Sequence, residues 1–356
     1  MSIPTMLTAA HGEPVTIAHV TPVTIAHVTA EYFPYARTGG LAEAVSGLAN
    51  FQRAAGLDVI AILPLYRTVR DEDPDLEPVG PPFAVHMGGR AEEVRIFRRA
   101  SAGGGPRVFF LDHREFFNRA GIYGEAGTDY PDNARRFAFL AFAATAALPR
   151  LAPGRVLLHC HDWHTALAPV YLRTRLAQER FAAGVTSVLS VHNPGYQGHF
   201  PPGTVADIGL PWEIYNWRQL EWYGKVNFLK GGLVFADSVT TVSPTQAREL
   251  CTPGGGFGLQ EVFVGLGSRL VGVLNGIDQR AWDPTTDPQI TAQYSAEKLE
   301  GKRRCKAALQ RSFGLPQRSR TPLFGMTGRM VTQKGLDLIL TAGHLLSTEA
   351  QFVFLG

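Results

Sequence analysis

Polar residues able to bind a ligand follow several strand-like segments of this chain. The segment ARTGGL (36–41) places Gly39 and Gly40 between an expected strand and an expected helix. Backbone N–H groups at such a turn, together with the helix dipole, can bind an anion such as a diphosphate. An ordinary strand-to-helix turn has the same pattern, so this segment alone leaves both interpretations open. It lacks the GxGxxG spacing, and Pro64 stands where the next strand would end in an acidic residue, which disfavours a nicotinamide site.

The hexapeptide HCHDWH (159–164) is the densest group of reactive side chains. Its histidines suggest a metal site, but the ligand spacing HxHxDH is not met, because Asp162 comes one place early and Trp163 occupies the ligand position. A second interpretation is a helix start at which Asp162 or His164 accepts hydrogen bonds from backbone N–H groups. A third is a sugar site, in which Asp162 binds hydroxyl groups and Trp163 stacks on a pyranose ring.

Two further segments combine polar side chains with a strand end. In SVHNPGYQG (190–198), His192 and Asn193 end an expected strand and align with the hexapeptide on the same sheet edge. In TGRMVTQKG (327–335), Arg329 and Lys334 lie on a strand-to-helix loop and form a cation pair suited to a leaving diphosphate. Taken alone, each segment is more often a packed or solvated loop than a site.

The first strand of the sheet has two candidate sequences. The octapeptide PVTIAHVT occurs at 14–21 and again at 22–29, and each copy is typical of a β-branched strand. The second copy is the better candidate because it leads directly into a loop and an amphipathic helix. The expected apolar side of that helix contains Leu41, Val45, Leu48 and Ala49. The first copy is expected to be an N-terminal extension.

Strand and helix patterns then alternate, which predicts an α/β fold with a parallel sheet and helices on both faces. After the strand DVIAILPLY (58–66), the runs FAVHM, VRIFRR and RVFFLDH predict strands inserted after one βαβ unit. A helix is expected from Asp132, and KVNFLKGGLVFA predicts another. Ser243 and Pro244 are expected at the N-cap and first position of a later helix. Ligands of such sheets bind at the carboxyl ends of the strands.

Composition limits the classes of function. The 356 residues include 45% apolar and 18% charged residues, which is ample for a buried core and excludes disorder. The net charge of +3 is spread along the chain, so we expect no nucleic-acid partner. No run of 18 apolar residues and no export signal is present, so no membrane association is expected, and the three widely spaced cysteines fit a reducing cytoplasm.

Six segments, in order from about Val23 to Gly356, resemble motifs of the bacterial glycogen synthase and plant starch synthase family. They are ARTGGLAEAVSGL, HCHDWHTALAPVYL, SVHNPGYQGHF, YGKVNFLKGGLVFADSVTTVSPTQARE, GVLNGIDQRAWDPTTD and TGRMVTQKGLDLIL. The resemblance implies a GT-B fold, with a complete N-terminal Rossmann-like domain, the beginning of a second, and an active site in the cleft between them. The expected division is 1–22 (extension with the duplicated strand), 23–271 (catalytic domain), 272–320 (linker) and 321–356 (start of the second domain, C-terminally truncated).

The resemblance implies retaining transfer of glucose from ADP-glucose to the 4-hydroxyl group at the non-reducing end of an α-1,4-glucan, as in glycogen biosynthesis. ADP-glucose and the glucan are then the partners, with no metal and no cofactor, and the oligomeric state stays open. The donor could also be UDP-glucose. Because the family's second domain continues with a glutamate-bearing segment that does not follow Gly356 here, we expect little or no transfer by the 356 residues alone.

Residue roles follow from the matched motifs. The resemblance implies that His192 acts at the transferred glucose and that Arg329 and Lys334 neutralise the departing ADP, on which negative charge grows as the glycosidic bond breaks. It implies substrate binding by Arg37, Gly39, Gly40, Glu43, Asp162, Trp163, Asn193, Tyr196, Gln197 and Asn275. Three positions depart from the family. Arg37 replaces a lysine, so a compact ammonium charge becomes a planar guanidinium group, Glu43 replaces an aspartate, and Gln260 replaces an acidic residue.

Two other functions remain as alternatives. One is a non-catalytic α-glucan-binding remnant that keeps the acceptor surface of the first domain. The other is a metal-dependent hydrolase that uses His159, His161 and His164, which the failed ligand spacing disfavours.

Overall fold

The computed structural model describes residues 7–8, 14–15, 23–73, 75–99, 104–279 and 281–356. The chain forms two units, Met1–Gly276 and Ile277–Gly356. In the first octapeptide copy, β2 (Pro14–Val15) pairs with β1 (Leu7–Thr8). The rest of that copy lies outside the described residues, so its role as an N-terminal extension stays a prediction.

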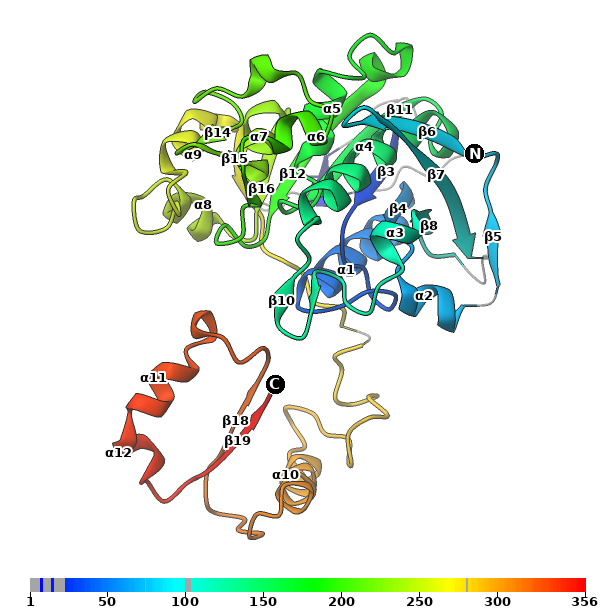
Figure 1. Ribbon diagram of the computed structural model, residues 1–356. Helices are drawn as coiled ribbons and strands as arrows, with labels where there is room; N and C mark the ends of the chain where they lie inside the picture. The colour runs from blue at the N-terminus through cyan, green and yellow to red at the C-terminus, as the bar shows by residue number, and fades with distance from the viewer. Residues whose placement is uncertain (1–6, 9–13, 16–22, 74, 100–103, 280) are drawn as a thin grey trace. The chain divides into compact units, whose positions relative to one another are not determined.

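The first unit is built on one large sheet, most of which is parallel (Figure 1). The strand order is β17-β16-β12-β11-β3-β4-β8-β7-β5, and β6 also pairs with β7. The parallel strands are β3 (Val23–Val28), β4 (Asp58–Pro64), β8 (Arg107–Asp112), β11 (Arg155–His161), β12 (Val185–Val191), β16 (Ser238–Thr241) and β17 (Leu270–Gly272). Nearly every residue of β3 and β4 is buried, as expected for strands covered on both faces. The second octapeptide copy thus supplies the first strand of this sheet along the chain, as predicted, and that strand lies at the sheet's centre.

An antiparallel extension continues the sheet beyond β8. It contains β5 (Leu76–Pro78), β6 (Phe83–Met87) and β7 (Arg90–Arg99). In β7, side chains facing the core alternate with exposed charged ones, which is the pattern of a strand with one solvated face. Two of the predicted inserted strands, FAVHM and VRIFRR, are β6 and part of β7, and the third, RVFFLDH, forms β8, which pairs in parallel with β4. The strand β5 is not among the predicted ones.

Helices cover both faces of the sheet. Because parallel crossovers are right-handed, α1 (Leu41–Ala54), on the connection from β3 to β4, lies on the opposite face from α5 (Leu167–Arg173), on the connection from β11 to β12. On the α5 face, α4 (Asn133–Leu151) packs against α5, and α5 packs against α7 (Phe228–Phe235). The remaining elements of this unit are α2 (Arg67–Glu72), α3 (Arg114–Phe117), α6 (Thr204–Asp207), α8 (Pro244–Leu250), α9 (Gln260–Leu266), and the short strands β9 (Gly124–Glu125), β10 (Thr128–Asp129), β13 (His199–Phe200), β14 (Glu221–Trp222) and β15 (Lys225–Asn227).

The structure corrects two details of the predicted helices. Leu48 of α1 is exposed, and Ala42, Val45, Ser46 and Ala49 form the buried side, so the apolar face is rotated from the one predicted. The predicted helix at 225–236 begins later, at Phe228, because Asn227 Oδ1 accepts the Lys230 N–H at 2.9 Å and caps it there. The start of α8 is as predicted, with Ser243 as N-cap accepting the Gln246 N–H at 2.9 Å and Pro244 at the first position.

The strand order reverses between β3 and β11. From β3 the chain builds outward through β4 and β8, then returns to β11 on the other side of β3 and continues to β12 and β16. At such a reversal the loops that follow the two central strands diverge and leave a crevice at the carboxyl ends. The loop from β3 to α1, the turn after β11 and the loop after β12 all start at this edge.

One buried arginine organises the segment between β8 and α4. Arg136 of α4 is fully buried and donates to Phe116 O at 2.7 Å, Ile122 O at 3.0 Å and Asn133 Oδ1 at 2.6 Å. Its guanidinium group also lies 4.9 Å from the centre of the Tyr130 ring. Arg136 therefore holds the loop 116–130, which carries Tyr123 toward the strand edge, by satisfying that loop's carbonyl groups.

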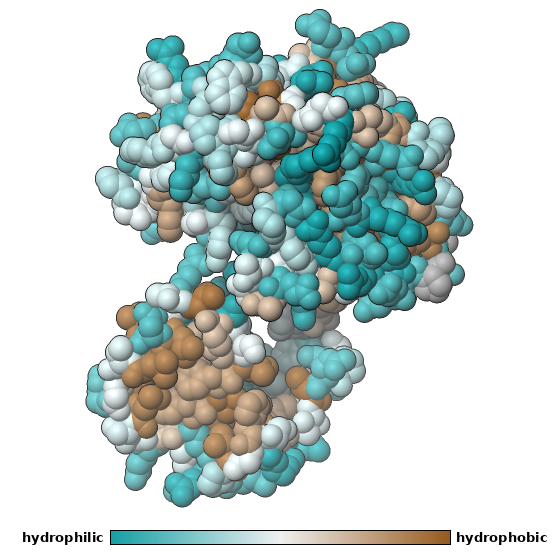
Figure 2. Space-filling model, in the orientation of Figure 1, coloured by the Kyte–Doolittle hydropathy of each residue, from teal (hydrophilic) through white to brown (hydrophobic). Residues whose placement is uncertain are grey.

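The second unit contains one βαβ crossover. The strands β18 (Leu323–Thr327) and β19 (Gln351–Leu355) are parallel, and α11 (Leu336–Thr341) and α12 (Gly343–Leu346) lie between them in the chain. The helix α10 (Glu300–Ser312) is tied to β19 by Gln310 Nε2, which donates to Gln351 Oε1 at 2.6 Å. Figure 2 shows apolar side chains gathered on one face of this unit. The exposed large apolar residues of this unit include Phe324, Met330, Leu338, Leu340, Leu346 and Leu355.

No helix in the described part of the chain has both the length and the hydropathy needed to cross a bilayer.

We predict that Arg136→Met lowers the free energy of unfolding by about 3 kcal/mol or more. The change leaves two buried acceptors, on Phe116 and Asn133, without their donor at about 1–3 kcal/mol each, and also the part-buried carbonyl of Ile122. Urea denaturation followed by circular dichroism measures the loss. The control is Arg150→Met in the exposed last turn of the same helix, with an expected cost of about 1 kcal/mol or less from its stacking on Phe83. Equal losses in the two variants would contradict the role given to Arg136.

Candidate active site

A buried carboxylate holds the loop between β3 and α1. Glu31 Oε2 accepts the Thr38 N–H at 2.6 Å and the Gly39 N–H at 3.1 Å, and Oε1 accepts the Thr38 hydroxyl at 2.8 Å. The Tyr123 hydroxyl donates to Oε1 at 2.6 Å from the loop that Arg136 holds. Glu31 was not predicted from the sequence, because an acidic residue just after an apolar strand has no distinctive local pattern. Glu31 therefore sets the conformation of the glycine turn.

The two glycines of this turn differ in what they can offer a ligand. The N–H of Gly39 is occupied by Glu31, so the expectation that both glycine N–H groups face an anion needs correction. The N–H of Gly40, directly before α1, has no partner among the described residues. A Cβ atom at either position would meet nothing within 4 Å, so the space beside the turn is open. Gly40 and the first turn of α1 are thus the part of this segment whose backbone donors an anion could contact.

Arg37 and Glu43 flank the turn. Arg37 Nη1 lies 3.0 Å from Glu43 Oε1, in a pair whose arginine side chain is 59% exposed. An exposed pair of this kind contributes little to stability, so the guanidinium group can exchange its partner at low cost. The other oxygen, Glu43 Oε2, is buried and has no hydrogen-bond partner among the described residues. One oxygen of Glu43 is thus buried without a donor, while the other holds Arg37.

Asp162 fastens the turn after β11 to the loop after β12. It has a positive φ of 57°, and its Oδ1 accepts the N–H groups of His192 at 2.7 Å and of Asn193 at 3.3 Å. Burial raises the pKa of this carboxyl group, while His192 and the backbone donors oppose the rise. The interpretation of Asp162 as a helix cap is therefore corrected: the donors that it satisfies belong to the neighbouring loop. Asp162, His192 and Asn193 are brought together.

Trp163 packs under the loop that follows β12. Its ring centre lies 5.2 Å from that of Phe137 and 5.8 Å from that of Phe200. The backbone of Gly198 passes so close that a Cβ there would lie 2.4 Å from Trp163 Cε3. The indole is thus held by packing contacts, and the residue as a whole is half-buried.

The other residues of this loop have different surroundings. Asn193 Oδ1 accepts the Gly195 N–H at 3.1 Å, and Tyr196 is 46% exposed. Gln197 is buried: its Nε2 donates to Pro194 O and Phe257 O, both at 3.0 Å, and its Oε1 accepts from Asn227 Nδ2 at 2.7 Å. The amide of Gln197 is therefore occupied in holding the loop, whereas Tyr196 is accessible.

The histidines do not form the trio considered from the sequence. His164 stacks on Tyr123 at 4.6 Å, and burial followed by the charge of Arg136 lowers its pKa to about 3. Within the described residues, the group able to share an ion is instead His27, His159 and His161. Each already has a partner: His27 and His161 are bonded to each other at 3.0 Å, and His159 Nε2 lies 2.7 Å from Ser190 Oγ. A metal would have to break these hydrogen bonds, so the geometry does not favour a metal-dependent hydrolase.

Three predicted residues lie apart from this strand edge along the chain. Asn275 is exposed at the end of the first unit. Arg329 and Lys334 are exposed residues of the second unit, in the loop between β18 and α11. The loop position of this cation pair agrees with the expectation from the sequence.

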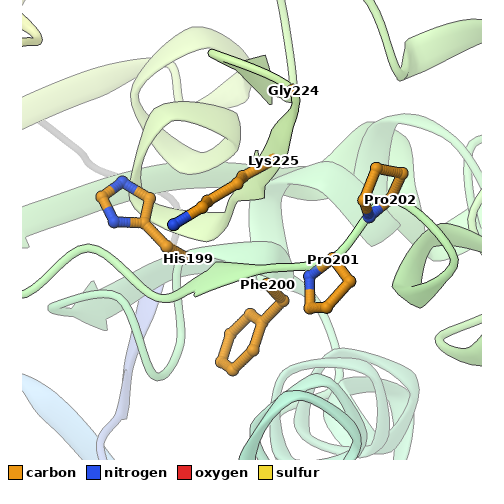
Figure 3. Close-up of a pocket in the computed structure, with 6 residues that line it drawn as sticks. All are labelled: His199, Phe200, Pro201, Pro202, Gly224 and Lys225. Carbon is orange, nitrogen blue, oxygen red and sulfur yellow. The ribbon is translucent and has the colours of Figure 1, made fainter.

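A pocket of about 370 Å³ lies beside the short strands β13 and β15 (Figure 3). Its lining consists of His199, Phe200, Pro201, Pro202, Gly224 and Lys225. His199 stacks on Trp222 at 4.4 Å, and burial and the charge of Lys225 lower its pKa. None of the residues predicted for the site lines this pocket, so the chemistry is better placed at the open strand edge.

Gly198→Ala should destabilise the protein more than Gly224→Ala. Both glycines have a positive φ, 67° and 76°, but a Cβ at Gly198 collides with Trp163 whereas one at Gly224 meets nothing within 4 Å. We expect a loss of about 1 kcal/mol from backbone strain at Gly224, and about 1–3 kcal/mol more at Gly198 from overpacking. Chemical denaturation measures both, and equal losses would show that Trp163 does not pack on this loop.

Glu31→Gln should loosen the glycine turn. A glutamine has one acceptor oxygen in place of two, so at least one donor of the turn loses its partner, and we expect a loss of about 2 kcal/mol and faster hydrogen exchange at the Thr38 and Gly39 amides. Tyr123→Phe, which removes a single donor to the same carboxylate, is the control, with a loss of about 1 kcal/mol and little change in those amides. Unchanged exchange in Glu31→Gln would refute the anchoring role.

Comparison with known proteins gives consistent matches. Residues 24–264 match the family model described as the starch synthase catalytic domain. The chain is 43% identical to a glycogen synthase of Syntrophotalea carbinolica over 92% of this chain and 67% of the relative. It is equally identical, at 43%, to a glycogen synthase of an Anaeromyxobacter species (strain Fw109-5), over 92% of this chain and 68% of the relative.

A solved structure agrees with these matches. The catalytic domain of starch synthase IV from Arabidopsis thaliana, bound to ADP and acarbose, superposes with a TM-score of 0.83 at 33% identity, covering 94% of this chain and 69% of that one. The chain thus spans about two thirds of the length of these relatives. The α/β architecture, the motifs along the chain and these similarities lead to one conclusion: the chain belongs to the glycogen synthase and starch synthase family of glycosyltransferases.

Proposed function

We propose that this chain carries the site for retaining transfer of glucose from ADP-glucose to the non-reducing end of an α-1,4-glucan, the glycogen-synthesising reaction. The observation that carries the proposal is the convergence, at the reversal point of the sheet, of the glycine turn after β3, Asp162 after β11 and His192 after β12. The related plant structure holds ADP and acarbose, which supports a nucleotide and a glucan as ligands.

The glycine turn supplies the proposed diphosphate contacts. The Gly40 N–H and the first turn of α1 offer partial positive charge, the space beside Gly39 and Gly40 is open, and the exposed Arg37 can turn from Glu43 to a phosphate. Glu43, whose side chain is 36% exposed, would offer its Oε1 atom to the nucleotide or sugar once Arg37 turns to the phosphate. These groups bind the donor in a defined orientation.

The turn after β11 and the loop after β12 supply the proposed sugar contacts. The Asp162 carboxylate holds the backbone of His192 and Asn193 in place, so we assign it chiefly a positioning role, with His192 and Asn193 at the transferred glucose. Tyr196 is exposed on the same loop and is assigned to the glucan. Trp163 and Gln197 shape this loop from beneath, and Asn275 retains its proposed substrate role from the matched motif.

Charge development explains the proposed cations. When the bond from the anomeric carbon to the phosphate oxygen breaks, its electron pair stays on the diphosphate. The acceptor 4-hydroxyl oxygen bonds to the same carbon, and its proton passes to the departing diphosphate. Preorganised cations stabilise that growing charge more than they stabilise the ground state. We assign this role to Arg329 and Lys334, with Arg37 as a further donor-binding cation.

Binding and transfer test the proposal together. Calorimetry should show that the chain binds ADP-glucose, and Arg37→Ala should weaken binding by at least about tenfold, the value of one charge-assisted hydrogen bond. Arg95→Ala is a matched control, because Arg95 is 57% exposed and paired with Glu93 at 2.7 Å, as Arg37 is with Glu43. Equal effects of the two changes, or tighter binding of UDP-glucose, would contradict the assigned donor site.

Incubation with radiolabelled ADP-glucose and glycogen tests the transfer itself. Label in the polymer supports the proposed reaction. Co-sedimentation with glycogen and no incorporation of label would favour the non-catalytic glucan-binding alternative.

A further inference from the structure

Four hydrogen-bonded side chains form a row along one face of the sheet, from Gln52 of α1 to His192. Gln52 Oε1 lies 2.7 Å from His27 Nε2, His27 Nδ1 lies 3.0 Å from His161 Nε2, and His161 Nδ1 lies 3.0 Å from His192 Nε2. The row exists because β3 and β11 are adjacent and parallel, with His27 opposite His159, and His161 two residues further on the same face. The face is the one covered by α1, which supplies Gln52.

The interior of the row is uncharged. Burial lowers the pKa of His27 to about 4, with the hydrogen bond to Gln52 opposing the shift. Burial, with the nearby histidines, also holds the pKa of His161 well below its usual value. Each of these rings therefore carries one N–H group at neutral pH, and each uses one nitrogen as donor and the other as acceptor.

One end of the row determines the direction of every hydrogen bond in it. A carbonyl oxygen only accepts, so Gln52 Oε1 requires a proton on His27 Nε2. His27 Nδ1 is then an acceptor and requires a proton on His161 Nε2. His161 Nδ1 in turn is an acceptor and requires a proton on His192 Nε2. In a neutral His192, the nitrogen that remains is Nδ1, and it carries a lone pair.

We propose that Gln52, His27 and His161 are positioning residues that fix the tautomer of His192, so that its Nδ1 serves as an acceptor for a hydroxyl group of the bound sugar. The inference rests on the proposed function, which assigns His192 to the transferred glucose. The row also fixes the plane of each ring, because a rotation that breaks one hydrogen bond leaves a buried nitrogen without a partner. Gln52, half-buried on a surface helix, thereby affects a sugar contact on the opposite side of two strands.

Asp162 completes this arrangement. It holds the backbone N–H of His192 at 2.7 Å, while the row holds the ring through Nε2. The backbone and the ring of His192 are thus fixed by independent contacts. Both are needed if the ring is to point its Nδ1 atom in one direction.

The test compares Gln52→Met with Phe51→Met, each introduced into the otherwise unchanged chain of 356 residues. Gln52→Met keeps the length of the side chain and removes the acceptor, and Phe51, its 67% exposed neighbour on the same helix, is the control. Long-range proton–nitrogen NMR of nitrogen-labelled histidines reports the protonated nitrogen in each ring. We expect the Nε2–H form for His27, His161 and His192 in the unchanged chain and in Phe51→Met, and a mixture of forms at His192 in Gln52→Met.

Calorimetric titration with ADP-glucose gives the functional reading. We expect Gln52→Met to weaken binding about fivefold, the value of one hydrogen bond, with no change in Phe51→Met. An Nδ1–H form of His192 in the unchanged chain, or equal affinity of both variants, would overturn the inference. If the unchanged chain itself fails to bind ADP-glucose, the proposed function fails, a result distinct from equal affinity of two binding variants.

Discussion

The reversal of strand order between β3 and β11 is the constraint on which the rest of the site depends. It places the carboxyl ends of three parallel strands, β3, β11 and β12, at one edge, and each strand end there carries a different kind of polar segment. The glycine turn lies at the first of these strand ends, Asp162 at the second and His192 at the third, and the proposed ligand site is built from them. Without the reversal, the loop after β3 would pack beside its neighbour and leave no crevice.

Two buried carboxylates at this edge hold the backbone of the loops in place. Glu31 accepts the N–H groups of Thr38 and Gly39, and Asp162 accepts those of His192 and Asn193. A buried carboxylate that accepts several backbone hydrogen bonds fixes a loop without needing regular secondary structure. Arg37 and the His192 ring, the side chains proposed to contact the ligand, are therefore carried by loops whose backbone is already held.

Much of the fold could be predicted from the sequence because strands and helices follow from local patterns. The first strand of the sheet, the inserted strands β6, β7 and β8 and the Ser243 cap were predicted from β-branched and apolar runs and from cap chemistry, and each agrees with the structure. The predicted apolar face of α1 was wrong at Leu48, because the side that is buried depends on how the helix packs on β4 and not on periodicity alone. The segments of the site were located by motif, yet Glu31 and His27 were missed, since an acidic residue and a histidine in or after a strand have no local signature.

The sequence by itself determined the family, the order of elements and the segments that carry polar chemistry, because these depend on residue types and short spacings. Tertiary structure alone decided which partners those residues take. In the folded chain the Gly39 N–H donates to Glu31, and His164 stacks on Tyr123 apart from the other histidines. Hydrogen bonds also connect Gln52, His27, His161 and His192 in one row. The physical reason is that hydrogen bonds across a parallel sheet join residues up to 134 positions apart, and their pairing is set by strand order and register.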